Sequence, residues 1–138
     1  MAEQLCELKK KGGGGSMSET VLWTNSNPTT AFAGQAVSLS QSINNFKYLK
    51  FTFYNGTGNT LLSESVISVE EFKKMTNDTS KSNFYRFSSP AYYHSNTGWV
   101  RLLFYSGDTS VNFSTVYKLN NSGTATNLLI PHQIIGLK

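Results

Sequence analysis

The sequence predicts an all-β protein: a jelly-roll-like β-sandwich of about eight short antiparallel strands, with at most one short helical turn. Apolar and polar residues alternate with a period of two in several segments, and short stretches rich in Gly, Asn and Ser separate these segments. The chain is 13% aromatic and only 14% charged, a composition that favours strands and polar turns over helices. A closed up-and-down barrel fits the same pattern.

The first sixteen residues, MAEQLCELKKKGGGGS, are a short charged peptide followed by a glycine-serine spacer. We interpret residues 1–16 as an engineered peptide with a flexible linker, because such a spacer has nothing to bury. Residues 17–138 are then expected to form a single β-sandwich domain. The only cysteine, Cys6, belongs to the peptide. A disulfide scaffold, a cysteine-ligated metal and thiol catalysis are therefore excluded for the domain.

The charge of the domain is mild. Without the three lysines and two glutamates of the peptide, nine basic and six acidic residues remain, and the basic ones are scattered. We therefore expect no nucleic-acid partner. No apolar run approaches the ~20 residues of a membrane span, and no secretory signal pattern is visible, so we expect no membrane insertion.

Three segments show the clearest strand pattern. In residues 48–54 (YLKFTFY), Leu49, Phe51 and Phe53 share one face. The two other segments are residues 99–105 (WVRLLFY) and 111–119 (VNFSTVYKL). Weaker strand candidates are residues 21–24, 35–39, 61–69, 84–87 and 128–137, and turn chemistry is seen at residues 55–59, 106–108 and 120–123.

The alternation also divides the aromatic side chains between two faces. In residues 99–105, it places Val100, Leu102 and Phe104 together. Rings on the opposite strand faces are expected to point outward and to be available to partners; these are Tyr48, Tyr54, Trp99 and Tyr105. Only residues 69–75 (VEEFKKM) suggest a helical turn.

Groups for catalysis are scarce, so we expect no enzyme. The domain has two histidines, His94 and His132, and six carboxylates without an informative arrangement. The adjacent Glu70 and Glu71 are typical of a solvated surface. No nucleophile elbow, zinc, phosphate-loop or calcium-loop motif occurs. The sequence therefore predicts neither a cofactor nor a metal site, and a hydrolase is the least favoured alternative.

A candidate ligand-binding site lies in residues 91–101 (AYYHSNTGWVR), around an Asn-Thr-Gly turn. Aromatic rings stack on the C–H faces of sugars, while amide, imidazole and guanidinium groups bond to their hydroxyls. The candidate ligand-binding residues are Tyr92, His94, Asn96, Trp99 and Arg101. In the alternative interpretation, Tyr92 and Trp99 pack against each other across a hairpin without any ligand.

Two further residues favour structural roles. Trp23 is expected to close the core of the sandwich near one chain end. His132, among apolar residues of the last strand, is expected to be a hydrogen-bonded structural histidine.

Both ends of the domain resemble the receptor-binding and tail-fibre domains of phages and prophages of Gram-positive bacteria. The opening, VLWTNSNPTTAFAGQ (residues 21–35), leads into the Ser-Leu strand at residues 37–40 as in that family, and the finish, IPHQIIGLK (residues 130–138), resembles the family's last strand. The central YLKFTFYN also fits, whereas residues 91–101 lie in the variable middle. The sequence departs from the family at His132, Gln133 and Ile135, where aromatic neighbours are more usual.

The resemblance implies a non-enzymatic component of the virion tail that binds a host-surface glycan or wall polymer. It also implies a homotrimer in contact with other tail proteins, with weak individual sites strengthened by their number. Two alternatives remain: a structural baseplate or decoration domain without host contact, and a carbohydrate-binding module of a secreted glycan hydrolase.

Overall fold

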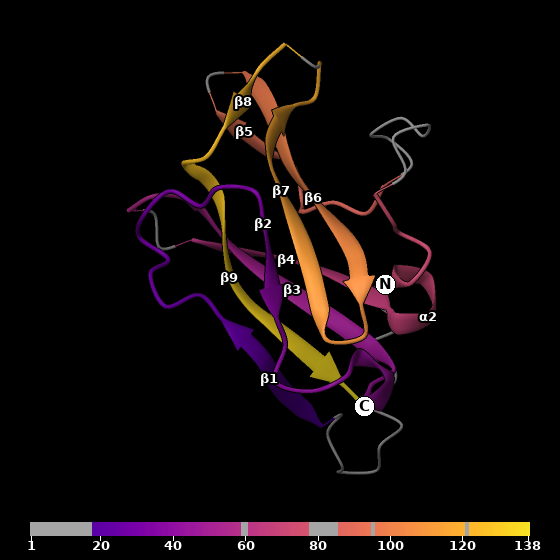
Figure 1. Ribbon diagram of the computed structural model, residues 1–138. Coiled ribbons are helices and arrows are strands. Elements are labelled where there is room, and N and C mark those ends of the chain that lie inside the picture. Colours follow the sequence, from indigo (N-terminus) through magenta and orange to yellow (C-terminus); the bar gives the residue numbers. More distant parts are fainter. Residues whose placement is uncertain (1–17, 59–60, 78–85, 95, 121) are drawn as a thin grey trace, which may run out of the picture.

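The computed structural model describes residues 18–58, 61–77, 86–94, 96–120 and 122–138. Its strands form two antiparallel sheets that pack face to face (Figure 1). The predicted β-sandwich is therefore confirmed. The alternative of a closed barrel is not what forms, since within the described residues no strand pairing joins the two sheets.

Each sheet combines strands that are distant in the sequence. The first sheet has the order β1-β9-β3-β4, with β1 (Glu19–Thr24), β9 (Leu128–Leu137), β3 (Tyr48–Gly56) and β4 (Leu62–Ser68). The second has the order β2-β7-β6-β5, with β2 (Gln35–Ser38), β7 (Ser110–Lys118), β6 (Thr97–Gly107) and β5 (Tyr92–His94), while the short β8 (Thr124–Ala125) pairs with β7. The first and last strands of the chain thus lie side by side.

Two single helical turns connect strands. The turn α2 (Val69–Phe72) begins at Ser68, whose hydroxyl accepts the amide N–H of Glu71, and it confirms the predicted helical turn in a shorter form. The 3-10 turn η1 (Ile43–Asn45), β5 and β8 are not among the predicted elements. Of the strand candidate at residues 84–87, only the last two residues are described, and they lie outside any strand.

The core lies between the sheets and is rich in aromatic rings. Leu49, Phe51 and Phe53 of β3 are completely buried, as the alternation predicts. Trp23 packs on Phe113 with ring centroids 5.7 Å apart, which confirms its expected place against the core. Burial of each such ring stabilises the fold by about 1.5–3 kcal/mol.

The expectation of outward rings is wrong for Tyr48 and Tyr105, and Tyr54 is likewise half-buried against the core. Tyr105 points to the core side of β6, where its ring meets Phe72 edge-on at 6.4 Å. Tyr48 is buried in a second small cluster with Ile135 and Leu137. In β6 the core side is therefore the side of Leu103, which is fully buried.

A β-bulge interrupts the predicted alternation of β7. Arg101 of β6 lies opposite Val116, and Leu103 lies opposite Phe113, so β7 contains one extra residue between these pairs. The extra residue moves Val116 to the buried side, although the strict alternation from Val111 places Thr115 there.

The two opposite ends of the sandwich each carry a group of polar and aromatic side chains. The turn between β5 and β6 lies at one end, next to β8, and we call it the hairpin end (Figure 1). The turn between β6 and β7 lies at the other end, near α2 and the C-terminus, and we call it the clasp end.

Candidate functional site

The candidate segment at residues 91–101 folds into a tight hairpin. Tyr92 lies opposite Trp99, Tyr93 opposite Gly98, and His94 opposite Thr97. Asn96 occupies the turn with φ of 64°, in the left-handed region that asparagine tolerates better than most residues.

One side of the hairpin carries Tyr92, Trp99 and Lys118. These residues are directly paired across three adjacent strands, so their side chains share one side of the sheet. The ammonium group of Lys118 lies 5.3 Å from the centre of the Trp99 ring, a cation–π contact. The register fits the alternative interpretation, in which Tyr92 and Trp99 pair across the hairpin.

The indole nitrogen of Trp99 is buried and has no hydrogen-bond acceptor. A ligand can reach this N–H only after local rearrangement, because no surface of the atom is open. With Lys118 over its ring, Trp99 therefore serves the packing of the hairpin more than ligand contact.

The other side of the hairpin carries the most exposed aromatic ring among the described residues. Tyr93 is 67% exposed, and its ring edge lies above Gly98, where an added Cβ would come within 3.0 Å of it. Leu119, just after β7, flanks the same glycine. Sequence reasoning placed Tyr93 in the segment but not among the ligand residues, although the adjacent Gly98 is the signal for a ring above it.

Arg101 is not available to a ligand, which corrects its place among the candidate residues. Its side chain is completely buried, and its guanidinium donates hydrogen bonds to the carbonyl oxygens of Leu129 (2.8 Å), Ser114 (2.7 Å) and Leu128 (3.1 Å). The guanidinium carbon also lies 5.3 Å from the centre of the Phe32 ring. Burial lowers the pKa of Arg101 to about 10, so the group stays charged at neutral pH.

Two of the remaining candidates lie at the tip of the hairpin. The backbone of His94 closes β5, and its side chain lies outside the described part of the structure. Asn96 is exposed at the turn. The hairpin end thus presents Tyr93 and Asn96 to solvent, an apolar ring beside an amide.

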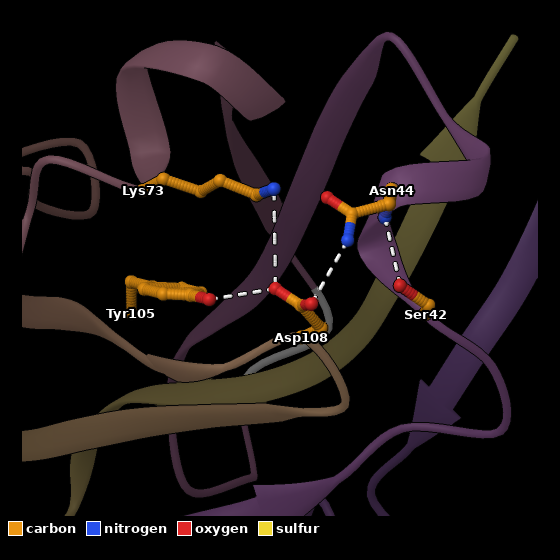
Figure 2. Close-up of polar contacts among 5 residues, drawn as sticks. All are labelled: Ser42, Asn44, Lys73, Tyr105 and Asp108. Carbon is orange, nitrogen blue, oxygen red and sulfur yellow. Dashed lines mark hydrogen bonds and ion pairs between the residues drawn. The ribbon is translucent and has the colours of Figure 1, made fainter.

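The clasp end holds a group of polar side chains around Asp108 (Figure 2). Its carboxylate accepts hydrogen bonds from the Tyr105 hydroxyl at 2.6 Å and the Asn44 amide at 2.9 Å, and the Lys73 ammonium lies 3.9 Å away. We call Asn44, Lys73, Tyr105 and Asp108 the clasp. The hydrogen bond from Tyr105, followed by the charge of Lys73 and the bond from Asn44, lowers the pKa of Asp108 despite partial desolvation.

The clasp connects parts of the fold rather than forming an acid–base pair. The backbone carbonyl of Asp108 also accepts the amide N–H of Ile43, so the β6–β7 turn is bonded to η1. The pKa of Tyr105 is raised, chiefly by its hydrogen bond to Asp108, which makes it a poorer base or nucleophile near neutral pH.

His132 has the expected structural surroundings. Its Nδ1 lies 3.1 Å from the Thr52 hydroxyl, and its ring lies 4.9 Å from the Tyr54 ring. Desolvation lowers its pKa, so the neutral form is favoured in the fold. His132 is the extra residue of a bulge between β9 and β3.

The described ranges contain no group of three or more His, Cys, Asp or Glu side chains placed to hold a metal ion. In the same ranges, no helix is both long and apolar enough to cross a membrane. Comparison with protein-family models finds no matching family, and a search of curated proteins finds no matching relative. The site must therefore be interpreted from its own geometry.

Proposed function

We propose that residues 17–138 are a non-enzymatic receptor-binding domain of a phage tail, which attaches to a glycan or wall polymer on the surface of a Gram-positive host. The exposed ring of Tyr93 carries this proposal. It stands above a glycine at the tip of a rigid β-hairpin and beside the exposed Asn96. A sugar can stack on such a ring and bond to a neighbouring amide.

The sequence resemblance supports the same function. Of the segments that carry it, residues 21–24 and 130–138 belong to the paired strands β1 and β9 of the first sheet, whereas residues 25–35 lead to β2, and the hairpin of β5 and β6 belongs to the second sheet. A scaffold of one family with a variable tip is the arrangement expected of an adhesin, because binding residues concentrate on loops held by a rigid framework.

A homotrimer is part of the proposal. Three exposed aliphatic side chains lie on, or directly before, edge strands of the first sheet: Val21 of β1, Leu62 of β4 and the adjacent Leu61. Edge strands are natural contact surfaces for neighbouring subunits. Exposed apolar residues at these two opposite edges also favour the alternative of a structural virion domain, which contacts tail proteins and no host molecule.

Binding to cells separates the two functions. We expect the domain to bind selected strains in a panel of intact Gram-positive cells, together with wall polysaccharide purified from those strains. Tyr93→Ala should weaken binding by about three- to tenfold per site, because it removes a stacking surface worth about 0.5–1.5 kcal/mol. In a multivalent assembly the loss is larger.

Lys74→Ala is the control, since Lys74 is exposed just after α2 at the clasp end and lies neither on the hairpin nor on an edge strand of the first sheet. Tyr93→Phe should retain binding, because the ring is kept. If no cell or polymer binds, or if both alanine variants behave alike, the adhesin function is refuted and the structural alternative is favoured.

A further inference from the structure

A cavity lies at the clasp end, remote from the hairpin. It is an open depression of about 520 Å³ between the segment that follows η1 and the start of α2. This volume falls within the range of small-molecule sites, which combine an apolar lining with a few polar groups.

The floor of the depression is apolar and fixed. Phe46, Tyr48 and Val69 line it, and all three are more than nine-tenths buried. The Phe46 ring packs directly on Gly136 of β9, where an added Cβ would lie only 2.5 Å from the ring. Such immobile apolar surfaces accept the C–H face of a sugar or polyol.

The rim carries two lysines and one carboxylate. Lys47 is exposed and makes no ion pair with any described carboxylate, while its backbone bonds to Leu137 and Val69. The Lys73 ammonium lies 3.9 Å from the carboxylate of Asp108, whose two oxygens already accept hydrogen bonds from Tyr105 and Asn44. Glu70 is the only carboxylate in the lining, and Asp108 offsets part of the charge of Lys73, so Lys47 is the main cation that the rim offers to an anion.

We propose that this depression is a binding site for an acidic saccharide, that is, a sugar unit that carries a phosphate or a carboxylate. The apolar floor receives the ring, and the ammonium groups of Lys47 and Lys73 receive the anion. The hydroxyl of Ser68 and the amide of Asn44 lie in the same lining for the remaining polar groups. The proposal rests on the cavity and not on the function proposed for the hairpin end.

The test is a titration of the 15N-labelled full chain, followed by NMR, with four probes: glucose 6-phosphate, glucuronate, glucose and inorganic phosphate. We expect both acidic sugars to shift the backbone amides of Lys47, Val69 and Lys73, with a Kd that rises with salt. Lys47→Gln and Lys73→Gln should each raise that Kd by about three- to fivefold, as loss of an exposed charge contact does.

Lys74→Gln is the matched control. Lys74 is next to Lys73 in the chain, but it is paired with Glu71 and does not line the depression. Equal effects of all three lysine variants, or no shift at the three amides with any probe, would overturn the proposal. Glucose that binds as well as glucose 6-phosphate would overturn the role of the anion, and inorganic phosphate that binds equally well would overturn the role of the sugar.

The outcome is separate from the function of the hairpin end. Tyr93→Ala should leave the titration at the clasp end unchanged, and Lys47→Gln should leave folding unchanged, because only its exposed side chain is altered. A failed titration alongside normal cell binding therefore removes only this second site.

Discussion

Arg101 has a structural role, although its residue type and its position in the candidate segment suggest a ligand contact. It is a buried cation without a carboxylate partner, and three backbone carbonyls take the place of one. One of them belongs to Leu129, whose backbone has φ of 46°, an unusual conformation for a residue with a side chain. The bond from Arg101 helps to hold Leu129 in that conformation.

Replacement of Arg101 should destabilise the whole domain. Arg101→Met removes the guanidinium donor from one buried and two part-buried carbonyls, so we expect the free energy of unfolding to fall by about 3 kcal/mol or more. Urea unfolding followed by tryptophan fluorescence measures the change. Lys118→Met removes a partly exposed cation over Trp99 and should cost less than about 1 kcal/mol. Similar losses for the two variants would contradict the stabilising role of the hydrogen bonds that Arg101 donates.

At the scale of elements, β-bulges decide which side chains reach the core. The extra residue of β7 brings Val116 inward, and the extra residue of β9 places His132 beside Thr52. A bulge changes the period of two locally, so it also changes the face of every residue that follows it in the strand.

Strand β9 is also constrained by Gly136, which lies against the Phe46 ring. Gly136→Ala places a methyl group 2.5–2.7 Å from three ring atoms, and a buried ring cannot withdraw as the end of a flexible chain can. We expect a loss of about 1–3 kcal/mol, as in other overpacked cores. Thermal unfolding checks this value. Gly123→Ala, whose added methyl would lie at an ordinary 3.6 Å from the Lys118 side chain, should leave the melting temperature nearly unchanged.

The sequence predicts regular strands better than irregular ones. In β3 the alternation of Leu49, Phe51 and Phe53 is uninterrupted, and both the strand and its buried face are predicted correctly. Alternation does not predict which side of β6 faces the core, because Arg101 lies on the core side, where a charged residue is unusual, while Leu102 and Phe104 on the opposite side are buried too.

The candidate site likewise has features that the sequence predicts and features that it does not. The sequence predicts a turn at Asn-Thr-Gly and offers the hairpin only as the alternative interpretation; Asn96 does lie in the turn, but Thr97 and Gly98 already belong to β6. The sequence does not predict that Tyr93 rather than Tyr92 is exposed, because this depends on which residues pack against each side of the sheet. The depression at the clasp end combines residues 44–48 with residues 68–73, and no local pattern predicts that these two segments meet.

At the scale of the whole molecule, the clasp joins three parts of the fold. Asp108 of the β6–β7 turn binds Asn44 of η1 and Tyr105 of β6, and lies within ion-pair distance of Lys73 just after α2. It thereby connects the second sheet to both helical turns that flank β3 and β4.

The clasp should make stability depend on pH. The folded pKa of Asp108 is lowered from its usual 3.8, mainly by the Tyr105 hydroxyl, so ionised Asp108 stabilises the folded state. This contribution is fully present above pH 3.8 and is lost as the pH falls through the lower folded value. We therefore expect Asp108→Asn to be less stable than the parent chain at pH 7, with the difference shrinking below about pH 4.

Urea unfolding of both chains between pH 2.5 and pH 7 measures this difference, the pH range being chosen to bracket the usual pKa of about 3.9. Tyr105→Phe should show a smaller pH dependence than the parent chain, because it removes the first cause of the shift. A difference between the parent chain and Asp108→Asn that stays constant with pH would contradict the role of the clasp.

The pairing of the first and last strands has a consequence for how the molecule can be held. The amide N–H of Lys138 bonds to the carbonyl of Ser18 at 3.1 Å, so both ends of the described chain leave from one side, at the clasp end. A tether at either end points the tip of Tyr93 and Asn96 away from the anchor. The same tether holds the depression between Lys47 and Lys73 close to the anchor. The two proposed sites therefore differ in reach. The hairpin end meets a distant surface first, whereas the depression meets only small molecules or polymer ends that enter the space beside the anchor.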